Sequence, residues 1–131
     1  MSACEAVITC LSNPAASVSD VGEKLPLVRN GKIWMKMSAT DEAEVKRLGA
    51  EVIQSQGKAV DCPVSGGCHQ AETGHTSIFA GCDRLTFEMI LPLLNKMDRC
   101  VLHTGALGSA IILKVITNYM ATEILYLILK R

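Results

Sequence analysis

The sequence has no excess of charge of either sign, because thirteen Lys and Arg side chains balance thirteen Asp and Glu side chains in 131 residues. No long run of like charge occurs, so we expect no binding to nucleic acid or to an acidic membrane surface. The first residues show no basic segment followed by an apolar signal core. Six cysteines form no Cys-x-x-Cys pair, so we expect reduced thiols and a cytoplasmic protein, with the mitochondrial matrix as an alternative.

The sequence also lacks the ligand spacing of a metal site. The candidate ligands Cys62, Cys68, His69 and His75 match no usual zinc framework. Cys68 and His69 are adjacent and would need an awkward bend to share one ion. His103 follows a short apolar run and is typical of a strand end. We therefore expect no metal.

Short apolar runs alternate with helix-favouring segments along most of the chain. With 49% hydrophobic residues, the chain can form the core of one domain. This alternation is typical of a parallel sheet with crossover helices. Gly57 ends one predicted helix, and Ser38, Thr40 and Asp83 are candidate helix caps. The predicted strands are 6–11, 32–37, 58–61, 76–81 and 99–103, and the predicted helices end near 28, run from about 41 to 56 and from 83 to 96, and begin beyond 105.

Three loops follow predicted strands at their carboxyl ends, at residues 12–14, 38–40 and 63–67. Ligands of parallel α/β sheets bind beyond these ends. If the strands are neighbours, the three loops line one crevice.

The third of these loops carries Ser65, Gly66 and Gly67 directly after Asp61 and Pro63. Two successive glycines let backbone amides approach an anion closely. A plain turn has the same composition, so the motif alone leaves both interpretations open.

A long apolar segment lies beyond Gly105. Its roughly 25 residues would form a helix of about 37 Å, which is long enough to span a membrane. Lys114, Asn118 and Glu123 argue against a lipid-facing helix, so we expect one buried in a larger protein or against a second copy. Lys114 and Asn118 share one helix face. They either satisfy loop carbonyls or form a functional pair in which the amide orients a lysine of lowered proton affinity.

In this order the motifs resemble those of the β-hydroxyacid dehydrogenase superfamily, which includes 3-hydroxyisobutyrate dehydrogenase, tartronate semialdehyde reductase and 6-phosphogluconate dehydrogenase. The resemblance rests on Asp-x-Pro-Val-Ser-Gly-Gly at 61–67 and on Gly108 followed by Lys114 and Asn118. Further similar segments lie at 11–14, 36–40, 71–74 and 79–81.

The resemblance implies an α/β fold. Residues 1–104 would form the second half of a Rossmann-like NAD(P)-binding domain, a mixed, mostly parallel sheet with flanking helices, and residues 105–131 would begin a long interdomain and dimerisation helix. The implied reaction is hydride transfer between NAD or NADP and a small 3-hydroxy acid, with Lys114 as general acid/base and Asn118 holding the substrate and orienting that lysine. The other implied contacts are Ser65, Gly66 and Gly67 to the substrate carboxylate, and Leu11, Ser12, Asn13, Ser38 and Ala39 to the cofactor.

The sequence departs from the family in several places. It contains no Gly-x-Gly-x-x-Gly, the motif that holds the cofactor pyrophosphate, and no counterpart of the family's further helical region. We therefore expect a truncated chain that is inactive alone and forms a homo-oligomer or joins a complementing chain. The alternative is a non-enzymatic assembly module that oligomerises through its apolar helix. Ser12, Ala39 and Ala110 replace the family's Pro, Thr and Gly, and Ala121 replaces the glutamate of 6-phosphogluconate dehydrogenase, which favours the small-hydroxyacid branch.

Overall fold

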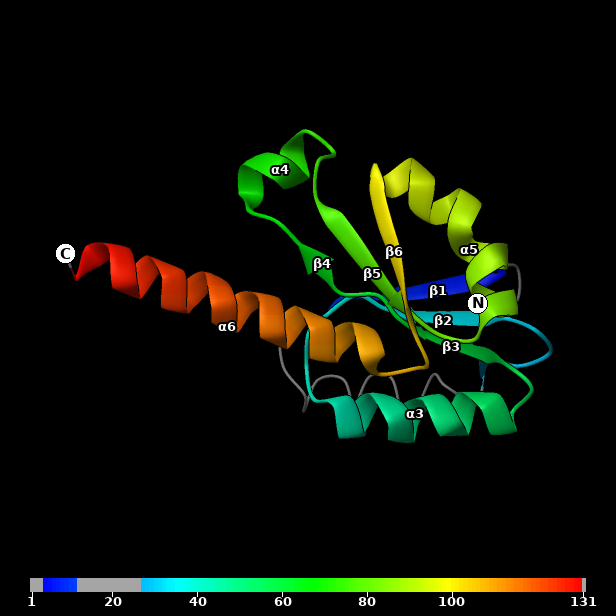
Figure 1. The fold of residues 1–131 in the computed structure, drawn as a ribbon. Helices are drawn as coiled ribbons and strands as arrows, with labels where there is room; N and C mark the ends of the chain where they lie inside the picture. Colours follow the sequence, from blue (N-terminus) through cyan, green and yellow to red (C-terminus); the bar gives the residue numbers. More distant parts are fainter. Residues whose placement is uncertain (1–3, 12–26, 131) are drawn as a thin grey trace.

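The computed structural model describes residues 4–11 and 27–130 and shows a mixed α/β fold with a mostly parallel sheet, as predicted (Figure 1). The loop expected at 12–14 and most of the helix expected before residue 28 lie outside the described residues. The strands are β1 (Ala6–Thr9), β2 (Ile33–Lys36), β3 (Lys58–Asp61), β4 (Val64–Ser65), β5 (Ser77–Gly81) and β6 (Cys100–Gly105). The helices are α3 (Glu42–Gln54), α4 (Cys68–Glu72), α5 (Arg84–Met97) and α6 (Ser109–Leu129).

The first three strands are parallel neighbours. Strand β2 lies between β1 and β3, and the register places Thr9, Lys36 and Asp61 side by side at the strand ends. This arrangement confirms the expectation that the three strands are neighbours. The loops at 38–40 and 63–67 therefore begin at the same edge of the sheet.

The segment from Lys58 to Ser65 changes its pairing partner along its length. Its first half pairs with β2, whereas Asp61, Val64 and Ser65 pair antiparallel with β5. Pro63 lies between the two halves and has no backbone N–H, but its carbonyl accepts a hydrogen bond from the Phe79 amide at 3.1 Å. Strand β6 then pairs parallel with β5. The short strand β4 was not predicted, because two residues carry no periodic signal.

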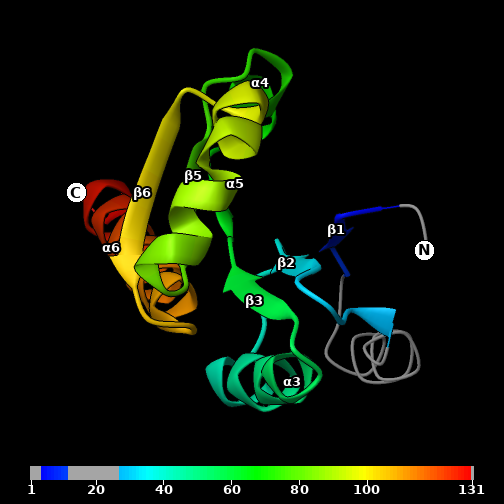
Figure 2. The same ribbon diagram turned by 90° about the vertical axis from the view of Figure 1, so that its right-hand side faces the viewer.

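Two cores lie on opposite faces of the sheet, one under α5 and one under α3 (Figure 2). Met35 and Val60 face α5, while the alternate residues Trp34 and Ala59 face α3. This alternation follows from the two-residue period of a strand. Lys36 and Asp61 are next in that alternation, so their side chains leave the sheet on the α3 face.

The N-cap of helix α3 is Asp41, not Ser38 or Thr40. The Asp41 carboxylate accepts a hydrogen bond from the Ala43 amide at 3.3 Å. The prediction that Ser38 or Thr40 caps this helix was wrong. Their hydroxyls instead accept hydrogen bonds from the Lys36 ammonium. The predicted cap of α5 is correct: Asp83 accepts from the Thr86 amide at 2.9 Å.

Helix α6 extends away from the sheet, and only its start is covered (Figure 1). Ala110 and Ile111 are buried, whereas the residues beyond Thr117 are exposed. The helix is long and apolar enough to cross a membrane, a property that core helices of soluble proteins share. The expected burial of this helix by a larger protein or a second copy stays a prediction.

Candidate active site

The two motifs that the sequence set 49 residues apart meet at the edge of the sheet. Lys114 on α6 donates a hydrogen bond from Nζ to Oγ of Ser65 on β4, at 3.3 Å. Both side chains are half-buried. Ser65, Gly66 and Gly67 together form the Ser-Gly-Gly corner. The Lys114 ammonium thus has a hydroxyl of this corner as its partner and not a loop carbonyl. An ammonium and a hydroxyl side by side can both donate to an anionic group.

Asp61 fixes the helix that carries Lys114. Its carboxylate is fully buried and accepts hydrogen bonds from the backbone amides of Gly108 at 2.7 Å and Ile111 at 3.0 Å. These are N–H groups of the first turn of α6, which have no partner inside the helix. Burial raises the pKa of the Asp61 carboxyl, and the bonds from Gly108 and Ile111 oppose that rise. Asp61 therefore links β3 to α6.

The positioning role of Asp61 was not predicted from the sequence, in which Asp61 is the first residue of the Asp-x-Pro-Val-Ser-Gly-Gly motif. The available signal was a carboxylate at the end of an apolar strand, which requires a specific partner when it is buried. Gly81 on β5 explains how the carboxylate fits: a Cβ at this position would collide with the Asp61 Oδ1 atom.

The glycines of the corner have different constraints. Gly66 has φ of 147°, and a Cβ there would lie 2.8 Å from Cγ2 of Thr76, so both backbone and space require glycine. Gly67 donates its amide to Oε1 of Gln70 at 2.7 Å. Both glycines are exposed. A carboxylate that takes the Gly67 amide must therefore displace the Gln70 side chain.

Asn118 lies one helical turn beyond Lys114 and is exposed. Between them, the Thr117 hydroxyl donates to the Lys114 carbonyl at 2.9 Å. Because Lys114 and Asn118 are four residues apart within α6, both lie on the same side of the helix.

Three of the predicted cofactor residues, Leu11, Ser38 and Ala39, belong to the described residues. Leu11 is half-buried against the core under α3, and Ser38 and Ala39 follow β2 in the adjacent loop. Ser38 is half-buried and Ala39 is exposed. Ser12 and Asn13 lie outside the described residues.

The four side chains considered above as metal ligands do not share one environment. Cys62 is buried in the core under α5, where burial raises the pKa of its thiol, whereas Cys68, His69 and His75 are exposed. Over residues 4–11 and 27–130, no three His, Cys, Asp or Glu side chains form a group that could hold a metal ion.

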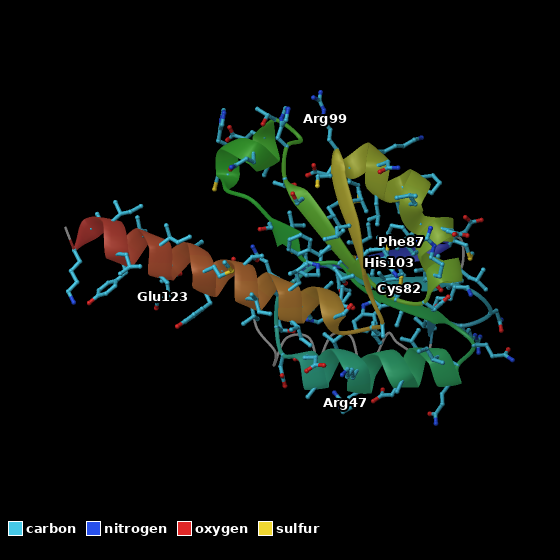
Figure 3. All side chains as sticks on the ribbon, viewed as in Figure 1. Arg47, Cys82, Phe87, Arg99, His103 and Glu123 are labelled. Carbon is cyan, nitrogen blue, oxygen red and sulfur yellow. The ribbon has the colours of Figure 1, made fainter. Side chains whose placement is uncertain are left out.

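His103 lies on β6 close to Phe87 and Cys82, as Figure 3 shows, and has a structural role. Its ring stacks on Phe87 with 4.5 Å between ring centroids, and its Nε2–H donates to the Cys82 carbonyl at 2.9 Å. The stacking holds α5 against β6, and the hydrogen bond joins β6 to the residue that follows β5.

Parallel strands lead at their carboxyl ends to a hydroxyl and glycine amides, and a lysine of α6 reaches the same place. This arrangement defines a class: a dinucleotide-type α/β domain with a polar site at the strand ends. The family model described as the NAD binding domain of 6-phosphogluconate dehydrogenase matches residues 1–105. The chain belongs to this family. This result confirms the resemblance to the β-hydroxyacid dehydrogenase superfamily and a nicotinamide cofactor as the ligand of the family.

Similar proteins agree with this assignment. Glyoxylate/succinic semialdehyde reductase 1 of Arabidopsis thaliana is 30% identical over 118 residues, which are 88% of this chain and 41% of that protein. The chain thus spans about two fifths of this relative's length.

Solved structures show the same fold. A 3-hydroxyisobutyrate dehydrogenase of Mycobacterium tuberculosis superposes with a TM-score of 0.85 at 23% identity, over 92% of this chain and 41% of that one. An imine reductase variant of Myxococcus stipitatus in complex with NAD+ superposes with a TM-score of 0.86 at 15% identity, over 96% and 44%. The predicted Rossmann-like fold is confirmed.

Proposed function

We propose that this chain carries the proton-transfer and carboxylate-binding elements of an NAD(P)-dependent 3-hydroxyacid dehydrogenase or reductase. The observation that supports this most directly is the hydrogen bond between Lys114 and Ser65, because it unites a candidate acid/base with a candidate anion site. Family membership supports hydride transfer as the reaction type.

The proposed chemistry assigns one task to each group. The Ser65 hydroxyl and the amides of Gly66 and Gly67 bind the substrate carboxylate, and the Lys114 amine takes the proton of the substrate hydroxyl during oxidation. In the reductive direction, Lys114 returns that proton to the new alkoxide oxygen. Asn118 holds the substrate on the side facing Lys114. A nicotinamide cofactor, when bound, accepts or supplies the hydride.

The loops at Leu11 and at Ser38 and Ala39 fit the nicotinamide end of such a cofactor, because they follow adjacent strand ends beside the site. The sequence has no Gly-x-Gly-x-x-Gly to hold the pyrophosphate. We therefore expect weak cofactor binding and no turnover by this chain alone.

Substrate binding can be tested without turnover. In an NMR titration with 3-hydroxyisobutyrate, we expect shift changes at the amides of Ser65, Gly66 and Gly67. Ser65→Ala and Lys114→Met should each weaken binding about tenfold, the cost of losing a hydrogen bond to a charged group. Lys130→Met, at the far end of the same helix, is the matched control and should leave affinity unchanged.

Unchanged affinity in Lys114→Met, or no shift changes at the corner, would refute the assignment of the site. Turnover assays with NAD+ and NADP+ complete the test. Turnover that disappears in Lys114→Met would overturn the expected inactivity while supporting Lys114 as the acid/base.

A second candidate function is assembly through α6, supported by its exposed apolar surface. Ile116, Tyr119, Ile124 and Leu127 are about half or more exposed. Such a surface requires cover in water. We expect a dimer at micromolar concentration in sedimentation velocity, with Ile124→Lys shifting it to monomer. Leu85→Lys on α5, where Leu85 is 72% exposed, is the control and should leave the dimer intact. A wild-type monomer at that concentration would exclude this candidate.

A further inference from the structure

Lys36 is a lysine buried at the end of a central strand, with 1% of its surface exposed. Its ammonium donates hydrogen bonds to the Ser38 carbonyl and the Ser38 hydroxyl, each at 3.3 Å, and to the Thr40 hydroxyl. All three acceptors belong to the loop of residues 38–40. The three donors of the ammonium are thus matched by three oxygens of one loop.

The environment of Lys36 connects this loop to α6. Lys36 and Asp61 are register partners on neighbouring parallel strands, so their side chains leave the same face of the sheet. Asp61 in turn accepts the amides of Gly108 and Ile111 at the start of α6. Opposite charges that share one buried face attract through a medium of low dielectric.

Helix α3 adds further acidic groups to this face. Glu44 is buried, and its Oε1 has no hydrogen-bond partner among the described residues. Burial lowers the pKa of the Lys36 ammonium, and the carboxylates of Glu44, Asp61 and Asp41 oppose part of that shift by favouring the charged form. Two of these carboxylates, those of Glu44 and Asp61, are themselves buried, so they favour the ammonium charge within the protein interior.

We propose that Lys36 is a positioning residue that fixes the 38–40 loop and couples it to the Lys114 helix through Asp61. An apolar side chain would fill this volume without the desolvation cost of an ammonium, so the charge is explained by the loop oxygens and carboxylates that it organises. The effect on the loop is independent of the proposed function. Only its consequence for cofactor placement at Ser38 and Ala39 rests on that function.

The experiment is an NMR comparison of variants, which requires no cofactor. We expect Lys36→Met to shift the amides of residues 37–41 and those of Gly108 and Ile111. Lys96→Met, an exposed lysine on α5, is the matched control and should shift neither group. In the wild-type protein, the Lys36 ammonium protons should give a slowly exchanging signal, because they are buried and hydrogen-bonded.

A thermodynamic cycle distinguishes coupling from general destabilisation. Lys36→Met and Thr40→Val should be non-additive in the unfolding equilibrium constant by about fivefold, as expected for residues in contact. Additive effects with unchanged amides at 37–41 would overturn the proposal. If Lys36→Met does not fold, absence of the slowly exchanging ammonium signal in the wild type would overturn it instead.

Discussion

Asp61→Ala should lower the free energy of unfolding by about 3 kcal/mol and release the start of α6 from the sheet. The substitution leaves the amides of Gly108 and Ile111 without their acceptor in a buried place, and each such group costs about 1–3 kcal/mol. Chemical denaturation followed by circular dichroism measures the loss. Hydrogen exchange at the two amides should accelerate beyond what the global change explains.

Asp83→Ala is the matched control, since Asp83 also caps a helix but is exposed. Loss of this cap should cost about 1 kcal/mol. Equal losses in the two variants would contradict the special role of Asp61.

Asp61→Asn separates hydrogen bonding from charge. Burial raises the pKa of Asp61 above its ordinary value of 3.8, so the folded state retains this proton to higher pH than the unfolded chain does. The part of the stability that this pKa shift contributes is therefore fully present below pH 3.8 and declines as pH rises through the raised pKa. Asp61→Asn should abolish this component of the pH dependence and cost less than Asp61→Ala, because one acceptor oxygen remains.

Trp34→Ala should cost about 3–5 kcal/mol, a large share of the stability of a domain of this size. Trp34 is 1% exposed and packs with Leu48 and Val52 of α3. Its Nε1–H also donates to the Thr9 hydroxyl at 3.0 Å, which ties β1 to β2. The substitution removes the largest side chain of this core and leaves a cavity. Thermal and urea unfolding followed by far-ultraviolet circular dichroism measures the effect.

Two variants calibrate this result. Trp34→Phe keeps most of the apolar volume and loses the hydrogen bond to Thr9, so we expect a cost of about 1–2 kcal/mol. Tyr119→Ala removes an aromatic ring that is 66% exposed on α6 and should change stability by less than about 0.5 kcal/mol. A Trp34→Ala protein as stable as Tyr119→Ala would show that the α3 core does not hold the sheet.

Local sequence signals predicted the elements well where the local preference agreed with the tertiary setting. The acidic first turn of α3, the Asp83 cap and the strand at 58–61 have propensities and patterns that agree with their tertiary setting. The cap of α3 was placed wrongly because Ser38 and Thr40 have the right hydroxyls for that role. Their preference was overridden by Lys36, whose ammonium needs acceptors once it is buried.

By itself, the sequence determined the order of the longer strands and helices that the structure describes, the family, and the two motifs around Ser65 and Lys114. These depend on residues near one another in the chain or on ordered motifs. Only the tertiary structure decided that Asp61 holds the first turn of α6, that Lys36 holds the 38–40 loop, and that the strand after Asp61 changes its partner. The physical reason is burial, because a charged group removed from water must find partners. The partners of Asp61 lie on a helix far away in the sequence, and those of Lys36 are needed only because the tertiary packing buries its ammonium.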